Sequence, residues 1–111
     1  DLLRKHQFEC NNIYPAFAYP GTPFYDKYVG EGIIEEPRSW EEYGLYSYEC
    51  KPLPTKHLTS AQVLSLRDEL FNEYYGDQNV QDNLRIKFGQ KTIDHIDEML
   101  SVKLKRKILA D

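Results

Sequence analysis

Residue types that build catalytic and metal centres are scarce in this sequence. It has two cysteines, Cys10 and Cys50, forty positions apart, and three scattered histidines. A structural zinc site needs about four Cys, His or carboxylate ligands at compatible spacing, and because no such motif occurs we expect no zinc site. A nucleophilic thiol would need a positioned base. His57 follows Cys50 in the sequence, but spacing alone does not bring the two together, and a buried structural thiol is the simpler interpretation.

Long apolar runs and targeting signals are also missing. No apolar stretch approaches the length of about 18 residues that a membrane-spanning helix needs, and the first residues show no signal-peptide pattern. The net charge of −4 argues against nonspecific binding to nucleic acid. We therefore expect a cytoplasmic location with reduced cysteines, and neither a nucleic-acid nor a membrane partner.

Two further patterns are too weak to indicate a site. His95 and Glu98 lie three positions apart on a predicted helix, but a carboxylate-bridged metal site in a bundle would need several more inward carboxylates. A solvated face is therefore favoured. The Gly-Glu-Gly run at 30–32 is too short for a phosphate-binding loop. We expect no catalytic and no metal-ligating residue, so the chain alone is not a complete enzyme.

One local exception to the acidic balance lies near the C-terminus. The cations there are Lys103, Lys105, Arg106 and Lys107. They stand at the end of a predicted helix, where positive charge complements the helix dipole. We favour that role over a phosphate-binding patch.

The remaining composition is that of one globular domain. The chain has 111 residues, of which 41% are hydrophobic and 29% charged, which allows one modest core. Aromatic residues are abundant, with nine Tyr, five Phe and one Trp. Such rings serve equally well in a core and at a contact with another domain.

The first third of the chain is predicted to form a strand, a tight turn and a short helix. Residues 8–19 contain strand-like stretches interrupted by a proline. The next four residues, PGTP, favour a turn, and Thr22 is placed to cap a helix that begins at Pro23. That helix is expected to stop at Gly30 or Gly32.

Residues 33–58 are predicted to be irregular. Ser39 is placed to cap one turn that carries Trp40 and Tyr43, and residues 45–48 are expected to be extended. The Lys-Pro-Leu-Pro run that follows should be stiff and extended, because each proline disfavours helix in its predecessor.

Residues 59–111 are predicted to form three helices. Thr59 and Gln62 have the spacing of a capping box. Glycines at positions 76 and 89 are helix stops, which gives helices at about 60–75, 79–88 and 91–109. The apolar stripes that indicate one shared core contain Val63, Leu66, Leu70 and Tyr74, broadened by Leu64 and Phe71; then Val80, Leu84 and Phe88; then Ile93, Ile96, Leu100, Leu104 and Ile108. The predicted class is α+β, predominantly helical: a short N-terminal strand and turn, an irregular aromatic-rich stretch, and a three-helix C-terminal bundle.

Residues 12–25 are NIYPAFAYPGTPFY, and motifs at 40–48, 53–61, 63–71, 87–89 and 104–107 follow them in order. Together they resemble the C-terminal region of cobalamin-binding-domain radical SAM proteins. Residues 12–25, NIYPAFAYPGTPFY, are similar to the last strand of that family's catalytic barrel, which runs into Tyr-Pro-Gly-Ser/Thr-Pro-Leu-Tyr. Residues 40–48 resemble its Trp-x-x-Tyr segment, and residues 53–61 its Leu-Pro-Thr…Leu-Ser/Thr-Ala stretch. Residues 63–71, VLSLRDELF, resemble its Val-Leu-x-x-Arg-Asp-x-x-Phe helix. Two shorter matches complete the set, KFG at 87–89 and LKRK at 104–107.

The resemblance implies a parent enzyme that cleaves S-adenosylmethionine at a 4Fe–4S cluster to give a deoxyadenosyl radical, with a cobalamin that assists methyl transfer or another radical step. The family's cluster motif, Cys-x-x-x-Cys-x-x-Cys, is absent, since Cys10 and Cys50 cannot supply it. The chain would then be a single C-terminal accessory module without a cofactor of its own. Its partners would be the upstream radical SAM barrel and the cobalamin-binding domain. In it, residues 1–32 would be the last barrel strand and helix, 33–58 a connector and 59–111 a helical cap.

The N-terminal segment carries the candidate site. A strand end followed by Pro-Gly-Thr would place free backbone groups at the carboxyl edge of a sheet, where ligands bind in α/β folds. The residues that would line the cofactor or substrate cavity of the parent are Tyr14, Ala16, Ala18 and Tyr19; packing in the barrel wall is the alternative. Separated from a barrel, residues 8–19 would leave strand edges unpaired. We expect them to be disordered, repacked on the helices, or paired with a second copy in a dimer, and a chain that begins near Thr22 to keep most of its stability.

Other residues and another class of function stay open. Core or interdomain packing is favoured over substrate contact for Trp40, Tyr43, Tyr46 and Tyr48. Arg67 and Asp68 are expected in a surface or interhelix ion pair. The chain begins with Asp1 rather than Met, which agrees with a piece of a longer polypeptide. The alternative is a freestanding helical protein-interaction module whose aromatic face docks a partner.

Overall fold

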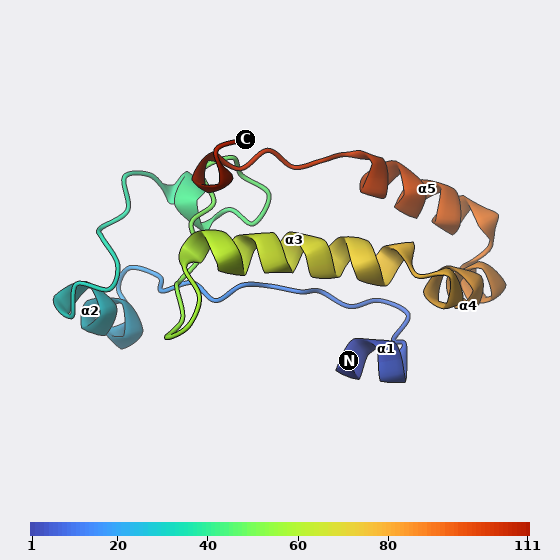
Figure 1. Cartoon of the computed structure of the whole chain (residues 1–111), viewed down its shortest axis with the longest axis horizontal. Helices are drawn as coiled ribbons and strands as arrows, with labels where there is room; N and C mark the ends of the chain where they lie inside the picture. Colours follow the sequence, from blue (N-terminus) through green and yellow to red (C-terminus); the bar gives the residue numbers. More distant parts are fainter. The chain divides into compact units, whose positions relative to one another are not determined.

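A computed structural model describes all residues from 1 to 111 (Figure 1). Helical residues make up 54% of the chain and no strand is present, so the fold is predominantly helical, as predicted. The α-helices are α1 (Leu2–His6), α2 (Pro23–Gly30), α3 (Ser60–Gly76), α4 (Gln78–Phe88) and α5 (Gln90–Ser101); the two 3-10 turns are η1 (Trp40–Tyr43) and η2 (Lys107–Leu109). None of these helices has the length and apolar character needed to span a membrane.

The predicted N-terminal strand, and with it the α+β class, is not confirmed. Residues 8–19 contain no helix and no strand. A strand requires a neighbouring strand to accept and donate its backbone hydrogen bonds, and this segment has a single such contact with the extended proline run, from Leu53 N–H to Ala16 O at 2.9 Å. Pro15 further removes one backbone donor.

The chain divides into two compact units, each made of segments that are distant in the sequence. Unit 1 contains residues 1–13 and 68–103, and unit 2 contains residues 14–67 and 104–111. The first residues of α3 belong to unit 2 and the last to unit 1. Each unit is described by itself below.

Unit 1 is stabilised by one apolar cluster. Its buried members are Tyr74, Tyr75, Val80, Leu84, Ile93 and Ile96, with Leu3, Phe71 and Leu100 packed against them. The end of α3, α4 and α5 therefore share a core, as predicted, but Phe88, which was assigned to the apolar stripe of the second helix, is 58% exposed. Asp77 caps α4 by accepting hydrogen bonds from two backbone N–H groups, and Gly89, at φ 85°, separates α4 from α5.

The buried side of α3 differs from the predicted stripe. Leu66 and Leu70 are 44% and 38% exposed, whereas Leu64 is fully buried and Arg67 is only 5% exposed. The sequence offers apolar residues on two adjacent sides of this helix, so the local pattern alone does not choose between them. The long aliphatic stem of Arg67 contributes apolar surface that a hydropathy pattern does not count.

The third predicted helix is shorter than expected. α5 ends at Ser101 rather than near position 109, and Val102 already has an extended backbone. The Ser101 hydroxyl donates to Glu98 O at 2.7 Å. The last turn of α5 contains no basic residue, so the predicted dipole role of the cations at 103–107 was wrong. These residues lie beyond the helix, and the chain from residue 104 onward belongs to unit 2.

Local helix-start signals are confirmed. Thr22 and Ser39 each accept a hydrogen bond from a backbone N–H of the turn that follows. The capping box is complete: Thr59 N–H donates to Gln62 Oε1 at 2.9 Å, and Gln62 N–H donates to Thr59 Oγ1 at 3.2 Å. Residues 45–48, predicted to be extended, instead form turns, which are closed by backbone hydrogen bonds from Ser47 N–H to Gly44 O and from Cys50 N–H to Ser47 O.

Candidate functional site

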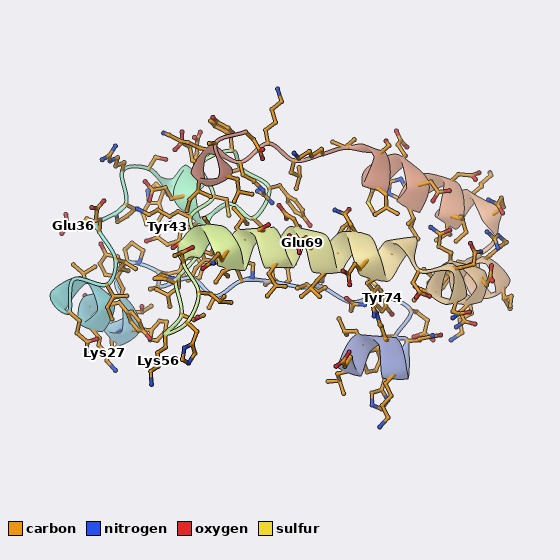
Figure 2. All side chains as sticks on the ribbon, viewed as in Figure 1. Lys27, Glu36, Tyr43, Lys56, Glu69 and Tyr74 are labelled. Carbon is orange, nitrogen blue, oxygen red and sulfur yellow. The ribbon has the colours of Figure 1, made fainter.

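Unit 2 contains a cleft of about 260 Å³. Its walls come from the end of the N-terminal segment, the stretch after α2, η1, the extended proline run and the start of α3; Tyr43 can be followed in Figure 2. The lining residues include Ala18, Glu35, Glu42, Tyr43, Lys51 and Leu53. This cleft is the candidate site.

The proline run positions the two sides of the cleft. Lys51 N–H donates to Glu42 O at 2.8 Å, and Leu53 N–H donates to Ala16 O at 2.9 Å. Pro52 and Leu53 are buried. Its prolines keep this run extended. The Lys51 N–H can therefore bind η1 while the Leu53 N–H binds the N-terminal segment. The cleft therefore has a fixed backbone frame.

The ionisable groups in the cleft are two carboxylates and one ammonium. Lys51 Nζ lies 3.9 Å from a Glu35 carboxylate oxygen, and both side chains are largely exposed, so this pair contributes little to stability. Glu42 Oε1 accepts the backbone N–H of Arg38 at 2.9 Å. The lining thus carries an excess of negative charge.

An aromatic cluster adjoins the cleft through Tyr43. The Tyr43 ring centroid lies 5.2 Å from that of Tyr19, 5.9 Å from that of Trp40 and 6.0 Å from that of Phe17. Trp40 is 74% exposed and Tyr19 is 50% exposed. Burial raises the pKa of Tyr43 above its ordinary value, so its hydroxyl stays protonated near neutral pH.

The four residues predicted to line a cavity fall in different places. Ala18 is buried and lines the cleft, and Tyr19 belongs to the adjoining aromatic cluster. Tyr14 is 64% exposed, and Ala16, also exposed, contributes its carbonyl oxygen to the frame. The structure brings Ala18 and Tyr19 to one region.

Two arginines are buried in unit 2, where the sequence predicted neither. Arg106 has no exposed surface, and its Nη1 donates to Leu45 O at 2.7 Å and to Ser47 O at 3.0 Å. Arg67 lies inside rather than on the surface, with its guanidinium carbon 5.6 Å from the centroid of the Tyr46 ring. These roles depend on carbonyls and rings far away in the sequence, so a local pattern gives no signal for them.

Unit 1 has a polar network around two tyrosines. The Tyr75 hydroxyl donates to Asn11 O at 2.8 Å and accepts the Asn11 N–H at 3.2 Å. The Tyr74 hydroxyl donates to Phe8 O, and Figure 2 shows Tyr74 projecting from α3 toward the N-terminal residues. Burial raises the pKa of both tyrosines, which keeps them protonated as donors. The network holds residues 8–11 against α3.

Metal ligands do not cluster in this structure. No group of three or more His, Cys, Asp or Glu side chains is placed to hold a metal ion. Cys10 is exposed, Cys50 is buried, and neither forms a disulfide; His95 and Glu98 are exposed on α5. Since the radical SAM cluster motif has three cysteines and the chain has two, these residues do not fit a 4Fe–4S cluster.

Comparisons of the chain with models of protein families, with curated proteins and with solved structures find no match. A function must therefore be argued from the order of the motifs and from the geometry of unit 2.

Proposed function

We propose that the chain is the C-terminal accessory region of a larger radical SAM, cobalamin-dependent enzyme. The observation that carries this proposal is the ordered series of motifs from residues 12–25 to residues 104–107, which extends over nearly the whole sequence. The upstream barrel and cobalamin-binding domain would bind S-adenosylmethionine, the 4Fe–4S cluster and cobalamin. The chain itself would contribute no catalytic residue. Methyl transfer is one reaction that such a parent would perform.

In this proposal residues 8–19 form a barrel strand in the parent, and α2 is the helix that follows it. Two features support this. The segment contains no helix and is not paired in a strand ladder, which is the state expected of a barrel strand separated from its neighbours. It then enters a turn in which Gly21 has φ 86° and Thr22 caps α2. Ala18 and Tyr19 would stand at the carboxyl end of the strand, where barrel ligands bind.

The test is to identify the native polypeptide. An antibody raised against this chain would capture the protein from its natural source, and mass spectrometry would give its size and sequence. We expect a polypeptide larger than 13.1 kDa that contains Cys-x-x-x-Cys-x-x-Cys upstream. Purified without oxygen, it should contain iron and sulfide and should cleave S-adenosylmethionine. A native polypeptide of 13.1 kDa would overturn the proposal.

A freestanding helical protein-interaction module is the second candidate. The observation in its favour is the exposure of large rings in unit 2, including Trp40 at 74% and Tyr46 at 66%. Exposed rings of this size are typical of protein contacts. This candidate requires a native polypeptide of the size of this chain, so the same mass measurement separates the two.

A further inference from the structure

Rings and a carboxylate of unit 2 share one surface, which we call the aromatic–acidic face: Tyr19 and Trp40, which are exposed, and Glu42 and Tyr43, which are half-buried. Trp40 and Tyr43 lie three positions apart on η1, the spacing that places side chains on one side of a 3-10 helix, and their ring centroids are 5.9 Å apart. Tyr19 joins them through its ring contact with Tyr43, and Glu42 lines the adjoining cleft together with Tyr43. A tryptophan that is 74% exposed leaves a large apolar surface in water, and its ring face attracts cations. The surface is therefore suited to a ligand that is both extended and positively charged.

The negative charge around the face also favours a positively charged ligand. Residues 31–43 contain five glutamates and one arginine, an excess of four negative charges that equals the net charge of the whole chain. The pKa of the Tyr43 hydroxyl is raised mainly by burial, and the nearby charges of Tyr25 and Glu42 raise it further. Such a patch attracts basic partners and repels acidic ones.

The size of the adjoining cleft limits what can enter it. At about 260 Å³ it is smaller than the roughly 300–1,000 Å³ of pockets for drug-sized ligands, so it suits a single side chain better than a nucleotide or a corrin ring. Ala18 and Leu53 offer apolar wall for an aliphatic stem, and Glu35 and Glu42 offer carboxylates. An arginine side chain combines those two properties, and its planar guanidinium also stacks on aromatic rings.

We propose that the aromatic–acidic face docks an arginine-containing basic segment of a protein partner. One arginine enters the cleft toward Glu35 and Glu42, and a neighbouring arginine stacks on Trp40. Arginine is favoured over lysine because its fork pairs with carboxylates in two-point fashion and its plane matches the rings. This inference does not depend on the radical SAM proposal, because every residue of the face lies in this chain.

The test uses Trp40 itself, which is the only tryptophan and therefore reports directly on the face. The chain is titrated with a short peptide of alternating arginine and serine while tryptophan emission is recorded. We expect a saturable change, with affinity that falls about tenfold or more between about 50 mM and about 500 mM sodium chloride. The lysine version of the peptide should bind several-fold more weakly, and the glutamate version should not bind.

Matched variants assign the effect to the face. Glu35→Gln with Glu42→Gln, which removes both carboxylates of the cleft, should weaken binding about fivefold or more, whereas Glu73→Gln with Glu98→Gln, which removes the same charge from unit 1, should change it less than about twofold. Trp40→Ala, followed by calorimetry, should also weaken binding, and because Trp40 is exposed this variant should fold. Equal losses in both charge variants, equal affinity for the arginine and lysine peptides, or no saturable change would overturn the proposal. A dimer that forms through this face, detected by sedimentation, would overturn it as well.

Discussion

Arg106 is a buried cation that donates hydrogen bonds to backbone carbonyl oxygens. Its side chain has no exposed surface, and it donates to Leu45 O and Ser47 O. Arg106→Ala would leave those half-buried acceptors without this donor and would open a cavity. We expect a loss of about 2–4 kcal/mol in the free energy of unfolding, measured by urea denaturation with Trp40 emission as the signal for unit 2. The neighbouring and exposed Lys105→Ala should cost less than about 0.5 kcal/mol; similar losses in the two variants would contradict the role given to Arg106.

Tyr74 and Tyr75 should make the stability of unit 1 depend on alkaline pH. Burial raises the pKa of both hydroxyls, so the folded state retains these protons more tightly than the unfolded state. Their contribution is complete below the unfolded tyrosine pKa of about 10 and is lost as pH rises through the folded values. Helical circular dichroism in urea should therefore show the midpoint falling above about pH 10, and Tyr75→Phe should reduce that fall. Tyr14→Phe, at a site that is 64% exposed, should leave the pH profile unchanged.

At the level of helices, two glycines that look alike in the sequence have different roles. Gly89 has φ 85°, a conformation that disfavours any side chain, whereas Gly76 is the last residue of α3 and has open space around its Cα. Gly89→Ala should destabilise the chain by about 1 kcal/mol or more. Gly76→Ala should stabilise it by about 0.5–1 kcal/mol, because alanine loses less backbone entropy in a helix. Thermal unfolding of both variants checks the signs; stabilisation by Gly89→Ala would contradict the turn described here.

The elements that could be predicted are those set by neighbouring residues. The capping box at Thr59 and the stop at Gly89 depend on hydrogen bonds and dihedral angles within one turn, so the local sequence contains the whole signal. The end of α5 at Ser101 could not be predicted, since the helical spacing of apolar residues continues beyond it. Residues 104–111 nevertheless belong to unit 2. The candidate site divides in the same way. Ala18 lines this cleft, but it was predicted to line a cavity of a parent enzyme at the end of a strand that is not confirmed, and that prediction stays open. Tyr43 and Lys51 reach the cleft only through contacts between distant segments.

At the scale of the whole molecule, each unit is completed by the N-terminal segment. In unit 1, Leu3 packs on the core, and the backbone of residues 8–11 accepts hydrogen bonds from the hydroxyls of Tyr74 and Tyr75. In unit 2, Ala18 is buried and Ala16 O accepts the Leu53 N–H. Repacking on the helices, one of the three outcomes expected for this segment, is the one observed in unit 1. The segment therefore contributes to both cores.

A chain that begins at Thr22 should consequently fold poorly, which reverses the expectation drawn from the sequence alone. It would lose the Tyr74 and Tyr75 partners of unit 1 and the Ala18 burial of unit 2. Each buried polar group left without a partner costs roughly 1–3 kcal/mol, and a domain of this size has only about 5–15 kcal/mol in total. We expect weaker helical circular dichroism and no cooperative urea transition. A synthetic peptide of residues 1–21, added to the shortened chain, should restore both signals, because the contacts of the segment do not require a covalent link. A shortened chain that keeps the transition midpoint of the full chain would show that these contacts contribute little to either core.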